Sequence, residues 1–318
     1  MSASSSASSS AESRPRNTLE TAREQLLNNS TVYIADANAV EELDWFTDDA
    51  SQESYVFKKT DEVPEGEAPE PILLSALGEI TRDDTFVVPD CRYEGPRFKE
   101  KKTLKDIKLT IALGKSLRHP MLAEEFDKGY SAMENLRQIR LDKMMGYGKV
   151  NGFIAIGKED QLPKLKFGHE VFKDRDHDTG ADIEFTNPEF TLAGYPVKSD
   201  NAKEELEAMV QNRSHELLPL PAFEQLPGDP EPRMILPSQY VSRLQGAVVK
   251  VEFYLTHIRI KSENKNVFMA DVFSIMVVAP PLETPRKSLS KRKATRYPHD
   301  REGSPSPMKR VRISNPTQ

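Results

Sequence analysis

Residues 248–278 decide the fold of this chain, and they read VVKVEFYLTHIRIKSENKNVFMADVFSIMVV. From 249 to 255, apolar residues alternate with polar or amphipathic ones, which predicts a strand with one buried face. Ile258 and Ile260 take the opposite parity, so we expect a β-bulge near His257. The segment therefore begins with a long strand that bends part of the way along.

A loop over 262–266 turns the chain, and a second strand returns over 267–278. The return strand is apolar at almost every position, which is typical of a strand covered on both sides. Pro280 and Pro281 end it, because proline has no N–H to donate to a neighbouring strand. A long, bulged hairpin of this kind suits the closure of a small β-barrel.

Shorter periodic segments precede the hairpin. Alternation or short apolar runs predict strands at 31–36, 45–46 with 55–57, 86–88, 107–113 and 153–156. Apolar residues at steps of three and four predict helices over 18–27, 120–145 and 202–211, of which the second is the longest. We therefore expect an α+β fold, a mostly antiparallel sheet or a partial OB-like β-barrel with one long helix.

Composition divides the chain into three parts. Residues 1–16 are rich in Ser and Ala without periodicity, which predicts a disordered tail. Residues 17–281 are expected to form the α+β domain, with an acidic N-terminal part over 17–84 and a core over 85–281. Residues 282–318 cannot build a core and are expected to be a disordered basic tail.

Charge is distributed unevenly over these parts. The net charge is −6, but the tail from 282 holds ten Lys or Arg against three acids, which is +7 and leaves −13 for residues 1–281. Within the domain, residues 97–175 carry eighteen basic against eleven acidic side chains. Binding to a polyanion would therefore depend on the middle of the chain and on the tail.

The sequence argues against a membrane or secreted protein. The longest largely apolar stretch, 273–279, is much shorter than the roughly 20 residues that a spanning helix needs. The N-terminus lacks the apolar core of a secretory signal. Cys91 is the single cysteine, so no intrachain disulfide can form, and we expect an intracellular protein without a metal or other cofactor.

One short pattern favours an enzyme. Pro89 and Asp90 follow the expected strand at 86–88, and Glu100 and Lys102 come about ten positions later, which resembles the PD…(D/E)xK motif of a nuclease superfamily. In that chemistry the carboxylates hold Mg²⁺ and the lysine positions the attacking water. The residues before Glu100 are not an apolar strand, so a surface turn is the simpler interpretation and the nuclease is an alternative.

A second pattern favours single-stranded nucleic acid as a ligand. OB-type barrels bind single strands through a basic groove and through aromatic rings that stack on bases. Tyr254 is the expected stacking residue because it lies on the polar face of the first hairpin strand, whereas Phe253, Phe268 and Phe273 are interpreted as core residues. The basic stretch that would line the groove contains Lys99, Lys101, Lys102, Lys105, Lys108, Lys115 and Arg118.

The C-terminal tail predicts a nuclear address. Two basic clusters resemble the signals that import receptors bind: Lys291, Arg292 and Lys293, and then Lys309, Arg310 and Arg312. Thr284 and Ser306 precede proline in the pattern of proline-directed kinases, and Ser304 is a weaker third site. A phosphate would add nearly two negative charges beside a cluster and could mask it.

Several stretches resemble a set of uncharacterised fungal proteins of similar layout, over about residues 30–281. They are LLSALGEI, CRYEGPRF, TLKDIKLTIALGKSLRHP, GYGKVNGFIAIG and PLPAF, together with the closing hairpin. That resemblance implies no chemistry and transfers no functional residue. The hairpin is also similar to the last strands of OB-type single-strand binders.

These observations rank three functions. The first is a nuclear, non-enzymatic binding protein whose leading ligand is single-stranded DNA or RNA. The second is an adaptor or regulatory protein that binds other proteins through its acidic surface. The third is the Mg²⁺-dependent nuclease.

Overall fold

The computed structural model describes residues 13–28, 31–48, 50–59, 67–91, 93, 95, 103–116, 118–144, 148–155, 162–175, 185–226 and 228–282. The chain divides into two units, Met1–Leu282 and Glu283–Gln318, and the described residues belong to the first. Among them, no helix is both long enough and apolar enough to cross a membrane.

Five strands of the first unit form a ring: β4 (Leu74–Ile80), β5 (Lys108–Gly114), β8 (Lys164–Glu170), β13 (Val248–Ile260) and β14 (Lys265–Ala279). Around the ring, β4 pairs with β5, β5 with β8, β8 with β14, β14 with β13, and β13 again with β4. Only the β8–β14 pair is parallel. When the five strands are numbered by their order in the chain, they follow one another around the ring as first, second, third, fifth and fourth. This is the strand order of the OB fold. The predicted α+β class with a partial OB-like barrel is confirmed.

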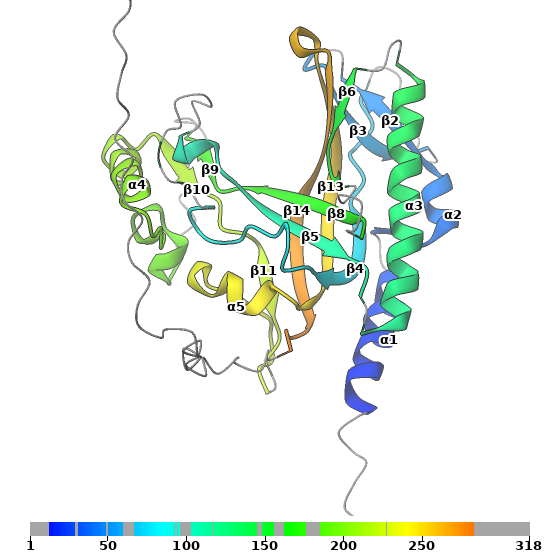
Figure 1. Ribbon diagram of the computed structural model, residues 1–318, viewed down its shortest axis with the longest axis horizontal. Coiled ribbons are helices and arrows are strands. Elements are labelled where there is room, and N and C mark those ends of the chain that lie inside the picture. Colours follow the sequence, from blue (N-terminus) through cyan, green and yellow to red (C-terminus); the bar gives the residue numbers. More distant parts are fainter. Residues whose placement is uncertain are drawn as a thin grey trace, which may run out of the picture. The chain divides into compact units, whose positions relative to one another are not determined.

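The remaining elements extend this ring (Figure 1). The added strands and the longer helices are β1 (Val32–Tyr33), β2 (Leu43–Thr47), β3 (Glu53–Lys58), β6 (Lys149–Asn151), β7 (Ile154–Ala155), β11 (Ala222–Glu224), β12 (Arg233–Met234), α1 (Ser13–Leu27), α3 (Pro120–Asp142) and α4 (Asp200–Asn212). Two short helices, α2 (Ala37–Glu41) and α5 (Tyr240–Leu244), complete the set with a separate two-stranded sheet of β9 (Phe172–Asp174) and β10 (His215–Leu217). Single 3₁₀ turns cover 104–106, 188–190, 192–194, 237–239 and 261–263.

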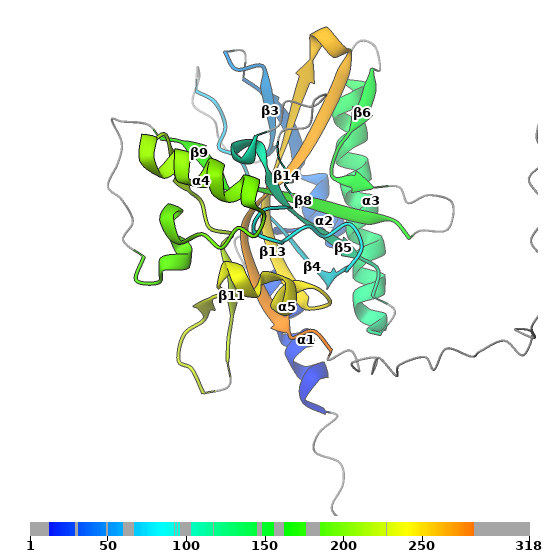
Figure 2. The same cartoon turned by 60° about the vertical axis from the view of Figure 1, so that its left-hand side comes forward.

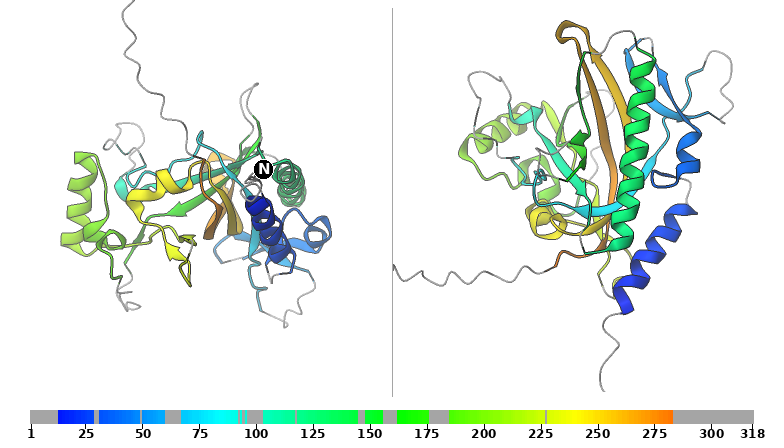
Figure 3. Two further views of the ribbon diagram at one scale, coloured as in Figure 1. Left: turned by 90° about the horizontal axis from the view of Figure 1, so that it is seen from below. Right: turned by 45° about the vertical axis from the view of Figure 1, so that its right-hand side comes forward.

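The hairpin of β13 and β14 is longer than the ring and projects beyond it as an arm. β3 pairs with the upper part of β13, and β6 pairs with the upper part of β14. Helix α3 runs alongside the arm (Figure 3), where the indole N–H of Trp45 donates to the carbonyl of Leu136 at 2.7 Å. The expected long helix is confirmed, and its apolar face packs on the sheet as predicted.

The buried face of the arm differs from the sequence-based prediction at His257. That side chain is fully buried, so the alternation of β13 continues through it and no bulge occurs there. The register shifts instead between Val248 and Val249 and between Glu252 and Phe253. Histidine is polar, so the sequence pattern did not identify position 257 as part of the buried face. The imidazole can be buried there because it has hydrogen-bond partners.

The return strand is not covered on both sides. Its residues alternate between buried and half-buried positions along most of β14, and Phe273 is 51% exposed. Phe273 is the extra residue of the second register shift, since Glu252 pairs with Ser274 while Phe253 pairs with Val272. A bulge re-aims a side chain, so a phenylalanine that was interpreted as core lies on the surface.

Two ring strands, β4 and β8, were not predicted at all. Both contain a glycine and a charged residue, LSALGEI and KLKFGHE, which weakens the apolar run that marks a strand. The expected strand at 86–88 is reduced to one bridge between Phe86 and Thr110. The predictions at 107–113 and 202–211 are confirmed as β5 and α4.

Candidate nucleic-acid interface

A row of aligned residues crosses the outer surface of the ring. Phe86 pairs with Thr110, Thr110 with Gly168, Gly168 with Asp271, and Asp271 with Tyr254. Directly paired residues on neighbouring strands point to the same face, so the five residues form one transverse row. With strands about 4.8 Å apart, the row is about 19 Å long. Figure 2 shows β5 and β8, two of the strands that carry the row, crossing the hairpin of β13 and β14.

Aromatic residues lie at both ends of this transverse row. Phe86 is half-buried at one end. At the other end the rings of Tyr254 and Phe273 meet edge to face with centroids 5.8 Å apart, and Phe273 is largely exposed. The exposed ring of Phe273, with the half-buried ring of Tyr254 beside it, offers an apolar surface on which a base can stack.

The centre of the row is open. A side chain added at Gly168 would approach only the Asp271 carboxylate, with Oδ1 3.9 Å from the new Cβ. The Asp271 Oδ2 atom accepts a hydrogen bond from the Thr256 hydroxyl at 3.2 Å. Burial is the main cause that raises the pKa of the Asp271 carboxyl, and the neighbouring Glu170 raises it further.

The cations beside the row are all paired with acids. Lys108 forms an ion pair with Glu170 at 2.8 Å. Lys164 and Lys166 share the carboxylate of Asp84, at 3.0 and 3.6 Å. These lysines hold the pKa of Asp84 below its usual range, mainly through the hydrogen bond from Lys164. Together with Asp271 this makes three cations and three anions, so the described surface around the row is neutral.

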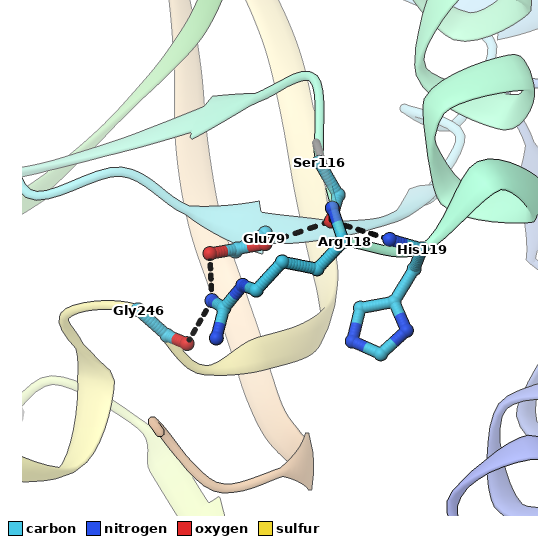
Figure 4. Close-up of polar contacts among 5 residues, drawn as sticks. All are labelled: Glu79, Ser116, Arg118, His119 and Gly246. Atoms are coloured by element: carbon cyan, nitrogen blue, oxygen red, sulfur yellow. Dashed lines mark hydrogen bonds and ion pairs between the residues drawn. The ribbon is translucent and has the colours of Figure 1, made fainter. Parts of the chain in front are cut away.

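A second polar cluster lies at the other end of β5. Arg118 contacts the Glu79 carboxylate and the carbonyl of Gly246, and the Ser116 hydroxyl donates to Glu79 at 2.8 Å (Figure 4). The backbone N–H groups of Arg118 and His119 donate to the same hydroxyl at 3.3 and 3.2 Å.

Lys115 and Arg118 line a hollow of about 310 Å³ in this second cluster. The other lining residues are Glu79, Thr81 and Gly114. Lys115 itself pairs with Asp127 on α3. Gly114 has a packing role here, because a Cβ at that position would lie 2.4 Å from the Thr81 methyl carbon.

The structure divides the predicted basic groove into two groups. Lys105 and Lys108 lie near the start of β5, and Lys115 and Arg118 lie past its end, about seven residues or 23 Å away. Lys105 is exposed and has no ion pair with another described residue. Lys99, Lys101 and Lys102 lie outside the described residues.

Tyr254, the expected stacking residue, lies at one end of the row, where it is half-buried. Sequence reasoning missed Phe86, Thr110, Gly168, Asp271 and Phe273 as surface residues. The signal for Thr110 was its place between apolar neighbours in β5. The other four depend on pairings that the sequence does not reveal.

Asp90 is engaged in holding the fold together. It is 5% exposed, and its Oδ2 atom accepts the backbone N–H groups of Lys198 and Ser199, each at 3.1 Å. Glu100 and Lys102 lie outside the described residues. In the described part, no three His, Cys, Asp or Glu side chains cluster closely enough to hold a metal ion.

The tail residues lie outside the described residues as well. These are the basic clusters at 291–293 and 309–312 and the three phosphorylation sites Thr284, Ser304 and Ser306. Their roles stay predictions from the sequence.

Comparison with known proteins assigns no family to this chain. No family model matches the sequence, and no curated protein matches it. The solved structure of gp2.5, a single-stranded DNA binding protein encoded by bacteriophage T7, aligns with a TM-score of 0.32 and 13% identity, over 68% of this chain and 96% of that chain. A TM-score this low carries no argument, so the assignment of the ring rests on its own strand order.

Proposed function

We propose that the protein binds single-stranded nucleic acid across the transverse row. The observation that supports this most is the open outer face of β5 and β8 in a ring of OB order, since OB folds bind oligonucleotides on the face of their second and third strands. The rings of Tyr254 and Phe273 beside that face supply a stacking surface.

The neutral charge of the row favours bases over phosphates as the groups that contact it. A phosphate near Asp271 would meet a carboxylate, whereas a stacked base is uncharged. In this proposal the phosphates face Lys108 and the segment that leads into β5, which carries Lys99, Lys101, Lys102 and Lys105. That segment joins the first two ring strands, a connection that OB folds also use for binding.

Fluorescence anisotropy with labelled 15-nucleotide DNA and RNA tests the proposal. Tyr254→Ala with Phe273→Ala should weaken binding about 5- to 150-fold, because the loss of one stacked base costs about 1–3 kcal/mol. Val210→Ala, an exposed apolar residue on α4, is the control and should leave binding unchanged. No binding of any oligonucleotide at low salt would refute the proposal.

The salt dependence of the affinity tests whether the lysines contact the phosphates. Five phosphate contacts predict a slope of log K against log salt of about −3.5. Lys101→Glu with Lys102→Glu should reduce that slope by about 1.4 units, since two contacts are lost. An unchanged slope in this variant would place the phosphates elsewhere.

We extend the proposal to the location of the protein. The two basic clusters of the tail are proposed to bind an import receptor, and phosphorylation at Thr284, Ser304 or Ser306 to mask them. A reporter fused to residues 282–318 should accumulate in the nucleus. A cytoplasmic reporter would refute this part.

A protein-binding adaptor is the second candidate, and the exposed side of the arm favours it. Phe273 and the half-buried Ile258, Val267 and Met269 form an apolar surface that a protein partner could cover. The adaptor predicts stable co-purification with another protein and no retention of oligonucleotides. The Phe273→Ala variant would then lose that partner.

A further inference from the structure

Gly168 has no structural reason to be a glycine. Its backbone does not have a positive φ, and an added Cβ would make one ordinary contact of 3.9 Å, with Asp271 Oδ1. Gly114, by contrast, is forced by the 2.4 Å approach of Thr81. A glycine inside a strand costs about 0.5–1 kcal/mol relative to alanine, and it often marks a place where another molecule approaches the backbone.

A carboxylate oxygen that accepts no hydrogen bond from a described residue lies above Gly168. The Thr256 hydroxyl holds Oδ2 of Asp271, while no described residue donates a hydrogen bond to Oδ1. Oδ1 is the atom that lies over the glycine. Asp271 is half-buried, and this burial raises the pKa of its carboxyl, so a donor that reaches Oδ1 gains more than it would in bulk solvent.

We infer that Asp271 selects bases that carry an exocyclic amino group, with the base edge placed over Gly168. This rests on the proposed function. Cytosine, adenine and guanine present an N–H₂ donor at the base edge, whereas thymine and uracil present carbonyl oxygens on both sides of their N–H. Those oxygens would face the carboxylate, and the base would be disfavoured.

Other occupants fit the space less well. A phosphate would be repelled by Asp271 and by Glu170, which is close enough to shift the Asp271 pKa. Lys108 is also near, but its single positive charge is outnumbered by the two carboxylates around this space. A metal ion would lack ligands, since no group of three metal-binding side chains occurs among the described residues.

The test compares 15-nucleotide oligomers of dC, dA and dT by fluorescence anisotropy. The intact chain should bind dC and dA about tenfold more tightly than dT, the difference expected from one hydrogen bond to a charged acceptor. Asp271→Asn should reduce the preference to within about twofold, because the amide can donate to thymine O4 as well as accept. Thr256→Val, which frees Oδ2 without removing the charge, should lower the preference but not abolish it.

Glu216→Gln is the matched control, because it removes one negative charge from a strand of the separate two-stranded sheet. It should leave the preference at tenfold. Equal binding of dC and dT by the unmodified chain, or an unchanged preference in Asp271→Asn, would overturn the inference and leave the proposed function standing. If none of the three oligomers binds, the proposed function itself is refuted.

Discussion

His257 should make the stability of the fold depend on pH. The imidazole is fully buried in the arm, where Nδ1 accepts from the Arg140 Nε–H at 3.3 Å and Nε2 lies 3.2 Å from Asn266 Oδ1. Since Nδ1 accepts, the proton sits on Nε2 and is donated to Asn266. A second proton would place an imidazolium beside the Arg140 guanidinium in a buried site.

Burial, more than the adjacent Arg140, lowers the pKa of His257 to about 4. In the unfolded chain the pKa is about 6.5, so between these values the unfolded state holds a proton that the folded state lacks. The free energy of unfolding is therefore not reduced by His257 above about pH 6.5, and it falls as the pH drops towards 4. The linkage relation gives a loss of about 2.5 kcal/mol at pH 4.5 relative to pH 7.

Urea unfolding followed by Trp45 fluorescence measures this loss. Trp45 is the single tryptophan, and its ring centroid lies 6.3 Å from that of His257. His257→Gln keeps an acceptor and a donor but does not titrate. The variant should be less stable at pH 7, and its deficit should shrink by about 2.5 kcal/mol by pH 4.5. A deficit that is the same at both pH values would refute the assignment.

Three further predictions concern the row and the tail. Gly168→Ala should leave the free energy of unfolding unchanged or raise it by up to about 1 kcal/mol. Gly114→Ala should lower the free energy of unfolding by about 1–3 kcal/mol, because its Cβ would clash with Thr81, and urea titration measures both variants. Gly168→Val should leave the thermal midpoint unchanged but weaken oligonucleotide binding about tenfold by filling the row; full binding would contradict an open site. Ser306→Glu should reduce nuclear accumulation of the 282–318 reporter, as measured by microscopy. The same nuclear accumulation as that of the unmodified reporter would show that a charge at Ser306 does not affect import.

Periodic strands and helices were predictable because their side chains report burial directly. The alternation of β5 and the three- and four-residue steps of α3 both have one buried face, and both were placed within a few residues. β4 was missed although six of its seven residues are buried and each of the six is apolar or small, because Ser75 and Gly78 break the apolar run. Packing against α3 and β13 stabilises that strand, and a local pattern does not record those partners.

The candidate site was less predictable, because it is made by pairing between distant strands. Tyr254 could be chosen from its parity in β13. Asp271 could not, since its neighbour Gly168 is more than one hundred positions away and the two meet only when the ring closes. The basic stretch was predictable as composition, but its division between the two ends of β5 follows from strand length alone.

The Gly168–Asp271 pair lies at the centre of the row and also joins the two strands that complete the ring, β8 and β14. β13 and β14 are paired along almost their whole length, whereas β8 and β14 share one registered pair, Gly168 with Asp271. A seam with so few backbone hydrogen bonds contributes little stability, so the ring is held mainly by its core and by the hairpin. A side chain at 168 would not disturb that core, because it would point outward. The fold therefore has room for a Cβ at this position, and the proposed approach of a base to the Asp271 carboxylate gives a reason for a glycine there.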